Sequence, residues 1–215
     1  MLTNIWMHDR IPGPLKNDRT EIEDAAIRGV SSKEKILPGL KHVRDYLDGL
    51  SFRQVLWLIP VLFIIHDIEE TPTIASYSQA LSERLGFLNI QPFTNEQAIF
   101  AMVLLIAIVL ALTYMFAGSP KNGIGMIILL SIQCLIFVNA ITHILSAIYL
   151  MDYTSGLVTA IMINIPFSIY LFNRALKEGR IDGKRFACSF IIGSVMYLPS
   201  VVIGIKAGEI IASLV

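Results

Sequence analysis

Residues 55–70 read VLWLIPVLFIIHDIEE, an apolar run that leads without a break into a cluster of histidine and carboxylate side chains. A helix needs about 20 mostly apolar residues to cross roughly 30 Å of hydrocarbon. The apolar run ends at Ile65, too early to cross alone, so a span that begins near Arg53 must include the charged cluster. Because a charged group at the centre of a span costs about 2.5–3.5 kcal/mol on insertion scales, we expect the cluster to face a partner or a water-filled cavity.

Further apolar runs of spanning length follow this one. We expect membrane spans at about 53–77, 96–117, 122–150, 154–173 and 186–212. The runs are continuous, whereas a transmembrane barrel would show alternating segments of about ten residues. The sequence therefore predicts an all-α, polytopic transmembrane helix bundle of about five spans in residues 52–215.

The composition agrees with a membrane protein and argues against a nucleic-acid partner. Hydrophobic residues make up 54% of the 215-residue chain and charged residues only 16%, whereas soluble domains carry about 25% charged residues. The formal net charge is +0, and neutralising nucleic-acid phosphates needs a basic surface. We therefore expect the lipid bilayer to be the main surroundings of this chain.

Residues 1–51 form an N-terminal extension ahead of the first expected span. Within residues 41–50, Val43, Tyr46 and Leu50 recur at helical spacing with charged residues between them. This pattern predicts a short amphipathic helix that lies in the membrane interface. A solvated linker helix is the alternative, because the segment is too short for its pattern to decide.

Lysine and arginine residues are concentrated on one side of the expected spans. The flank at 41–53 and the loop at 174–185 are rich in them, whereas the first and third loops hold few. Because cytoplasmic loops carry the excess of Lys and Arg, we expect a cytoplasmic N-terminus and an external C-terminus. The expected location is the inner membrane of a prokaryotic cell.

The charged cluster has one face that carries most of its chemistry. On a helix, His66 lies beside Glu69 at i+3 and Glu70 at i+4. Asp67 is about 100° away around the helix and points elsewhere. The third expected span carries a second polar pair, Asn139 and His143.

The two polar pairs fall at similar depth in the expected bundle. At about 1.5 Å per residue from the cytoplasmic ends of their spans, both lie in the outer half of the membrane. Asn164, in the fourth span, lies roughly 15 Å in from the outer side and next to Pro166. We therefore predict that these polar side chains converge on one centre, since each is costly to leave facing lipid.

The string His66-Asp67-Ile68-Glu69-Glu70 resembles the motif that names the HXXEE-motif membrane protein family. The Asn139-x-x-x-His143 helix and the Asn164-x-Pro166-Phe167 segment are similar to later polar positions of the family. The resemblance covers about residues 52–212. The family has no assigned function, so the resemblance implies a membrane enzyme without naming its reaction.

The clustered residues suit a divalent metal such as zinc, iron or manganese, because two histidines and a carboxylate form a common ligand set. We predict three metal ligands: His66, Glu70 and His143. Glu70 is preferred to Glu69 because helical side chains lean towards the N-terminus, which brings Glu70 towards His66. The candidate catalytic residues are Glu69 as a base or proton carrier, together with Asn139 and Asn164.

The favoured function is a metal-dependent membrane enzyme, a hydrolase or an oxidoreductase, that acts on a lipid-like or hydrophobic small molecule. The first alternative is a metal-free isomerase in which the same histidines and carboxylates act as acid and base. A transporter or a structural membrane protein with a buried polar cluster is the other alternative. The expected partners are the bilayer and a hydrophobic substrate, and assembly into a homo-oligomer stays open.

Overall fold

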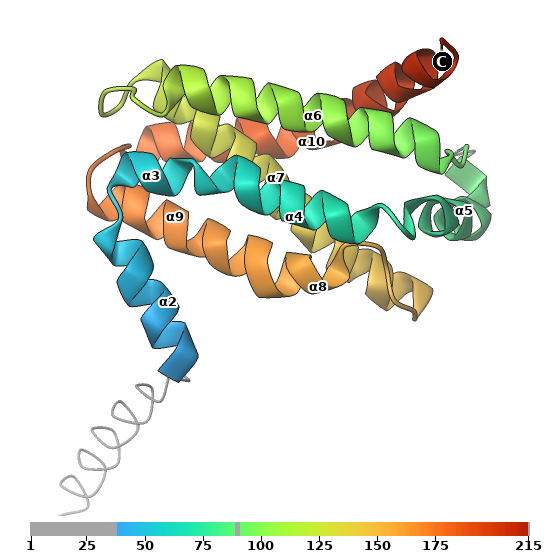
Figure 1. Cartoon of the computed structure of the whole chain (residues 1–215), viewed down its shortest axis with the longest axis horizontal. Helices are drawn as coiled ribbons and strands as arrows, with labels where there is room; N and C mark the ends of the chain where they lie inside the picture. The colour runs from blue at the N-terminus through green and yellow to red at the C-terminus, as the bar shows by residue number, and fades with distance from the viewer. Residues whose placement is uncertain (1–37, 89–90, 215) are drawn as a thin grey trace, which may run out of the picture. The chain divides into compact units, whose positions relative to one another are not determined.

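The computed structural model describes residues 38–88 and 91–214 of the chain. In these residues it contains helices and no strand, which confirms the all-helical prediction (Figure 1). The chain divides into two compact units, Met1–Gly49 and Leu50–Val215. Most of the predicted N-terminal extension, residues 1–37, lies outside the described residues.

In the first unit, helix α2 (Pro38–Gly49) confirms the helix predicted within residues 41–50. Val43 and Tyr46 are exposed on it, and an Arg44–Asp48 ion pair of 3.6 Å joins successive turns. The helix is therefore amphipathic, as its spacing indicated. Its place in a membrane interface stays a prediction.

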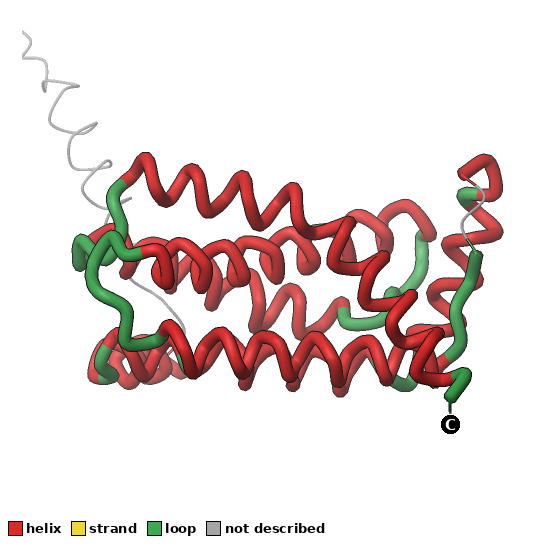
Figure 2. Tube along the Cα trace, turned by 90° about the horizontal axis from the view of Figure 1, so that it is seen from above, coloured by secondary structure: helices red, strands yellow, loops and turns green. Residues whose placement is uncertain are grey.

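The second unit is a bundle of long helices with short connecting helices, and its loops gather at the two ends of the bundle (Figure 2). In chain order the elements are α3 (Phe52–Leu56), α4 (Leu58–Glu70), α5 (Ile74–Arg84), η2 (Gly86–Leu88), α6 (Asn95–Phe116), α7 (Ile124–Leu150), α8 (Leu157–Thr159), the π-helix η3 (Ala160–Asn164), α9 (Ile165–Lys177) and α10 (Gly183–Ala212). Helix α7 packs against α6, α9 and α10, and α4 packs against α6 and η3.

Several helices of the bundle are long and apolar enough to cross a membrane. Four meet this description by themselves: Asn95–Phe116, Ile124–Leu150, Leu157–Lys177 and Gly183–Ala212. A fifth is added if Lys41–Gly49 and Phe52–Glu70 are counted together as one broken span. The fold is therefore that of a polytopic helical bundle with four to five candidate spans, compatible with an integral membrane protein.

The first expected span, 53–77, is shorter in the structure than predicted. Helix α4 ends at Glu70, and a turn closed by a 3.1 Å bond from Thr73 N to the Glu70 carbonyl leads into the separate helix α5. Pro72 lies in this turn, and proline removes an amide donor that a continuing helix would use. The carboxylate of Glu70 therefore lies in the last turn of its helix, beside the loops.

The apolar core and the polar cluster occupy different parts of the bundle. Leu56, Leu129 and Leu171, from α3, α7 and α9, are 0% exposed and belong to one buried hydrophobic core. The histidine and carboxylate cluster lies in the other half of α4 and α7, towards their C-terminal ends. Hydrophobic core residues therefore pack at the end of the bundle that the charge pattern predicts to be cytoplasmic.

Helix α10 approaches α7 through a glycine, which gives a stability prediction. A Cβ built on Gly193 would lie 2.4 Å from the Ser131 carbonyl oxygen, a backbone atom that cannot turn aside. We expect Gly193→Ala to destabilise the protein by about 1–3 kcal/mol through overpacking, measured as a lower thermal unfolding midpoint in detergent. Gly204→Ala is the matched control on α10, because its Cβ would meet ordinary contacts of 3.4 Å or more. Equal effects of the two substitutions would contradict this packing.

Candidate functional site

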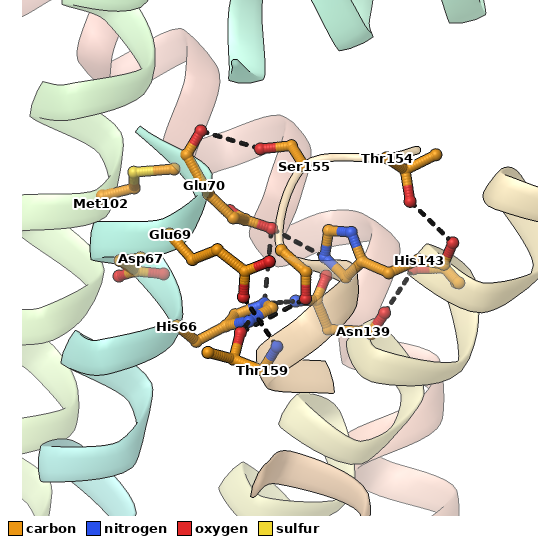
Figure 3. Close-up of polar contacts among 12 residues, drawn as sticks. His66, Asp67, Glu69, Glu70, Met102, Asn139, His143, Thr154, Ser155 and Thr159 are labelled. Carbon is orange, nitrogen blue, oxygen red and sulfur yellow. Dashed lines mark hydrogen bonds and ion pairs between the residues drawn. The ribbon is translucent and has the colours of Figure 1, made fainter. Parts of the chain in front are cut away.

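Three buried side chains from two helices meet at the end of α4. His66 and Glu70 lie one turn apart on α4, and His143 reaches them from α7 (Figure 3). The side chains are buried, with residue exposures of 0%, 8% and 4%. One ligand atom from each lies within 4.8 Å of the others. The predicted convergence of these three residues is confirmed.

Glu70 contacts both imidazoles through one oxygen. Its Oε1 lies 2.7 Å from Nε2 of His143 and 3.4 Å from Nε2 of His66. The two rings meet edge to face, with their centroids 5.0 Å apart. A single carboxylate oxygen therefore faces a ring nitrogen of each histidine.

His66 is held at both ring nitrogens. Its Nδ1 lies 2.6 Å from the Thr159 hydroxyl, which lies 3.3 Å from the Gly156 carbonyl and donates to it. Since that hydroxyl proton is used, Nδ1 of His66 is the donor to Thr159 and Nε2 keeps its lone pair. The Asn139 amide lies 3.0 Å from Nε2 and donates to it. This arrangement favours the tautomer in which Nε2 carries the lone pair, which Asn139 occupies in these contacts.

His143 is held through its backbone and by Glu70, and its Nδ1 has no partner among the described residues. The Thr154 hydroxyl donates to the His143 carbonyl at 2.9 Å. Among the described residues Nδ1 of His143 has no hydrogen-bond partner, whereas Nε2 lies 2.7 Å from Oε1 of Glu70. Buried polar atoms in proteins almost always find a partner, so Nδ1 of His143 has hydrogen-bonding capacity that the described residues do not use.

The loop between α7 and α8 covers the three side chains. The Ser155 hydroxyl donates to the Glu70 carbonyl at 2.8 Å, so this loop holds α4 as well as α7. Gly156 has a φ of +77°, and a Cβ on it would lie 2.7 Å from His66 Cε1 and 2.9 Å from Glu70 Oε1. Only glycine fits both the left-handed backbone and the close approach to the site.

Glu69 points to this loop rather than into the contact between the histidines. Its carboxylate accepts hydrogen bonds from the backbone amides of Val158 (3.0 Å) and Thr159 (2.7 Å) and from the Tyr153 hydroxyl (2.6 Å). Burial, and then the bond to Glu69, raise the pKa of Tyr153 to about 12, so that its hydroxyl stays a donor near neutral pH. The carboxylate therefore caps the start of α8, where free amides favour an anion.

Of the other residues predicted from the sequence, Asn139 contacts one of the three side chains, whereas Asn164 makes no bond with them among the described residues. Asn139 contacts His66 directly, as described above. Asn164 is buried at 1% exposure in η3 and has no contact with the three side chains among the bonds of the described residues. Asp67 is also buried, with one carboxylate oxygen unpartnered in the described part of the chain, and Figure 3 shows it on the side of α4 away from His143.

The sequence did not reveal the residues of the loop and of α8 that hold the site. Thr154, Ser155, Gly156 and Thr159 were given no role, although all four contact the cluster or its helices. A signal was present, because a run of hydroxyl residues and a glycine follows the third span on the side where both polar pairs were expected. Such short runs are common in loops, so the run alone does not identify a site.

The three side chains are of types that could hold a metal ion, and their ligand atoms lie close together. Nitrogen and oxygen ligands of tetrahedral zinc lie about 2.0–2.2 Å from the ion and thus about 3.3–3.6 Å from one another. The 3.4 Å contact of Glu70 with His66 falls in this range, the 2.7 Å contact with His143 is shorter, and all the ligand atoms lie within 4.8 Å of one another. The donor atoms would be a ring nitrogen of His143 and Nε2 of His66, the latter after Asn139 moves away from it. Small rotations of the side chains would complete the ligand set.

Comparison with known proteins finds a relative and a family. The chain is 22% identical over 146 residues to the uncharacterized protein YrkK of Bacillus subtilis (strain 168), an alignment that covers 67% of this chain and 89% of YrkK. No solved structure matches. The family model for proteins of unknown function with an HXXEE motif matches residues 57–171, a narrower range than the 52–212 expected from the motifs. Because this match covers more than half of the sequence, the chain belongs to the family of proteins of unknown function with an HXXEE motif.

Proposed function

We propose that the protein is a metal-dependent enzyme embedded in the membrane that acts on a lipid-like or hydrophobic small molecule. The observation that carries the proposal is the buried meeting of His66, Glu70 and His143, with ligand atoms within 4.8 Å of one another. Two imidazoles and one carboxylate are the donor set of catalytic zinc and of many non-haem iron centres. Three protein ligands leave room for a water or a substrate atom.

Each ligand has a defined support in this proposal. Thr159 holds His66 in the tautomer that presents Nε2, and the loop hydroxyls of Thr154 and Ser155 fix the backbones of α7 and α4. A bound metal would polarise a substrate oxygen or lower the pKa of a bound water. Asn139 occupies the lone pair of His66 Nε2 in the metal-free arrangement, and once displaced its amide could donate to a substrate oxygen.

Glu69 is better placed to position the site than to act as its base. Its carboxylate already accepts two backbone amides and a phenol hydroxyl, and hydrogen bonds to the ionised form lower the basicity of a carboxylate. Glu69 accepts from the backbone amide of Thr159, and the hydroxyl of the same Thr159 contacts His66. We therefore assign Glu69 to positioning α8, and the base role predicted from the sequence stays without support in these contacts.

The surroundings of the site favour a hydrophobic substrate. Apolar side chains next to the cluster face outward, including Ile68 on α4 (67% exposed) and Val158 on α8 (56% exposed). In a bilayer these faces contact lipid, so a lipid-soluble molecule reaches the loop of residues 151–156 without crossing water. A hydrophobic core packs at the other end of the bundle, and such packing favours an enzyme over a transporter.

A metal-free isomerase is the second candidate, and one contact favours it. A single Glu70 oxygen touches Nε2 of both His66 and His143, so the three groups form a coupled set that can share protons. Such a set would supply the acid and the base for moving a proton across a double bond. It differs from the first candidate by needing no metal for activity.

An activity assay on lipid mixtures tests the proposed function. Purified protein is incubated in detergent micelles with a total lipid extract, and the lipids are compared by mass spectrometry with and without a chelator. We expect a change in at least one lipid species that the chelator suppresses and that Glu70→Gln lacks. A change that the chelator leaves intact would support the isomerase, and identical spectra throughout would contradict an enzyme acting on lipids.

We further propose a cytoplasmic N-terminus in a prokaryotic inner membrane, from the Lys and Arg residues at 41–53 and 174–185. With five spans, a reporter enzyme that is active only outside the cytoplasm should be active when fused after Val215. The same reporter fused in the loop at 178–182 should be inactive. Activity at 178–182, or inactivity at the C-terminus, would contradict this topology.

A further inference from the structure

A second group of buried polar side chains lies deeper in the bundle than the metal ligands. Asn164 in η3, Gln133 on α7 and Ser168 on α9 are 1%, 1% and 0% exposed. The Gln133 amide donates to the Ser168 hydroxyl at 2.7 Å, and that hydroxyl donates to the backbone carbonyl of Asn164, one turn earlier in its own helix, at 2.6 Å. The three residues therefore belong to one polar cluster between α7 and the helix of residues 157–177.

This cluster has hydrogen-bonding capacity that the described residues do not use. Neither side-chain atom of Asn164 has a partner, and Oε1 of Gln133 has none either. The free groups are thus one amide nitrogen and two amide oxygens. Leaving such a buried group unpaired costs about 1–3 kcal/mol, so a ligand is expected where several lie together.

The helix beside the cluster is also irregular, because one of its turns is widened and one backbone amide donor is missing. Residues 160–164 form a π-helix, in which Ile165 N bonds to the Ala160 carbonyl, five residues back. Pro166 follows and has no amide hydrogen, so the preceding turn lacks one backbone donor. Widened turns of this kind are frequent where a helix accommodates a ligand or a water.

The mixture of donors and acceptors identifies the ligand class. A cation would be repelled by the amide hydrogens of Asn164, and no carboxylate belongs to the cluster to balance its charge. An anion would be repelled by the amide oxygens of Asn164 and Gln133. Water donates and accepts, and buried waters typically bind polar groups that the protein leaves unpaired.

We propose that Gln133 and Asn164 bind ordered water in the interior of the bundle, on the inner side of His66. Gln133 precedes Asn139, the residue in contact with His66, by six positions on α7, or about 9 Å of helix at 1.5 Å per residue. The water site extends the polar interior from the metal ligands towards the apolar core, where Leu129 and Leu171 close it. It does not depend on a metal, so it stands or falls separately from the proposed function.

A set of leucine substitutions tests the site. If the Asn164 amide binds water, Asn164→Leu should lower the thermal unfolding midpoint, whereas if the amide is simply unpaired, Asn164→Leu should raise it. If water bridges the cluster, Asn164→Leu removes the groups that bind this water. Oε1 of Gln133 then loses its partner, and the thermal unfolding midpoint in detergent falls. Adding Gln133→Leu should then cost less than it does in the wild type. Asn173→Leu is the control, since Asn173 is exposed on the same helix and should change the midpoint little. A midpoint that rises or stays unchanged in Asn164→Leu would overturn the proposal.

A direct observation decides the matter if Asn164→Leu does not fold. An experimental structure of the wild type at a resolution that shows ordered water should contain water within hydrogen-bond distance of the Asn164 side chain. Density showing that the Asn164 amide is paired only with protein groups would overturn the proposal.

Discussion

Glu70→Gln is expected to lower metal affinity by more than about 100-fold, while Glu69→Gln keeps the metal. Glutamine preserves the size of Glu70 but removes the charged oxygen that contacts both histidines. Losing a residue that only supports a ligand already lowers metal affinity about 10–100-fold, so losing a ligand should exceed that. The measurement is metal content after dialysis, with the affinity for added zinc determined by competition with a chelator.

The adjacent glutamates make this comparison a matched pair. Glu69 lies next in sequence, but its carboxylate caps α8, so Glu69→Gln should weaken the cap and lower the unfolding midpoint without emptying the site. Equal metal loss in both variants would contradict the distinction drawn between them. Full metal content in both would show that neither carboxylate is a ligand.

Gly156→Val is expected to have the largest effect on stability of any single substitution in the loop over the site. Valine would bring its Cβ to 2.7 Å from His66 Cε1 at a φ of +77°. The left-handed backbone costs about 1–2 kcal/mol and overpacking about 1–3 kcal/mol, so we expect a loss of roughly 2–5 kcal/mol. The unfolding midpoint in detergent reports this loss, and metal content should fall with it because His66 is displaced.

Gly179→Val separates the two parts of the Gly156 effect. Gly179 has a similar φ of +61°, but a Cβ on it would meet nothing within 4 Å. It should therefore lose only the backbone contribution and keep its metal. If the two variants lose the same stability, the loop does not pack on His66 as the structure has it.

The fold was largely predictable because membrane spans have a strong signal in the sequence. Continuous apolar runs predicted the helices, and the bounds of α6 and α7 differ from the expected ones by only a few residues. The predicted end of the first span, at residue 77, was wrong, because the polar turn around Pro72 ends α4 at Glu70. A hydropathy profile averages over many residues and does not resolve such a short turn, whereas a single residue such as Pro72 is enough to end a helix.

The site was predictable where helix geometry alone decides it. Spacing at i, i+4 placed His66 beside Glu70, and the cost of burying polar groups in lipid brought His143 to them. The role of Glu69 was not decided by spacing, because its direction depends on the amides at the start of α8. Contacts between a helix and a distant loop depend on tertiary packing, and a single sequence contains no periodic signal for them.

If His66, Glu70 and His143 bind a metal, elemental analysis of the purified protein should detect it. The wild-type protein, extracted in detergent and dialysed against metal-free buffer, should contain about one equivalent of zinc, iron or manganese per chain. Glu70→Gln prepared in parallel should contain almost none. A wild type whose content of every transition metal equals that of Glu70→Gln would show that these three residues do not hold a metal.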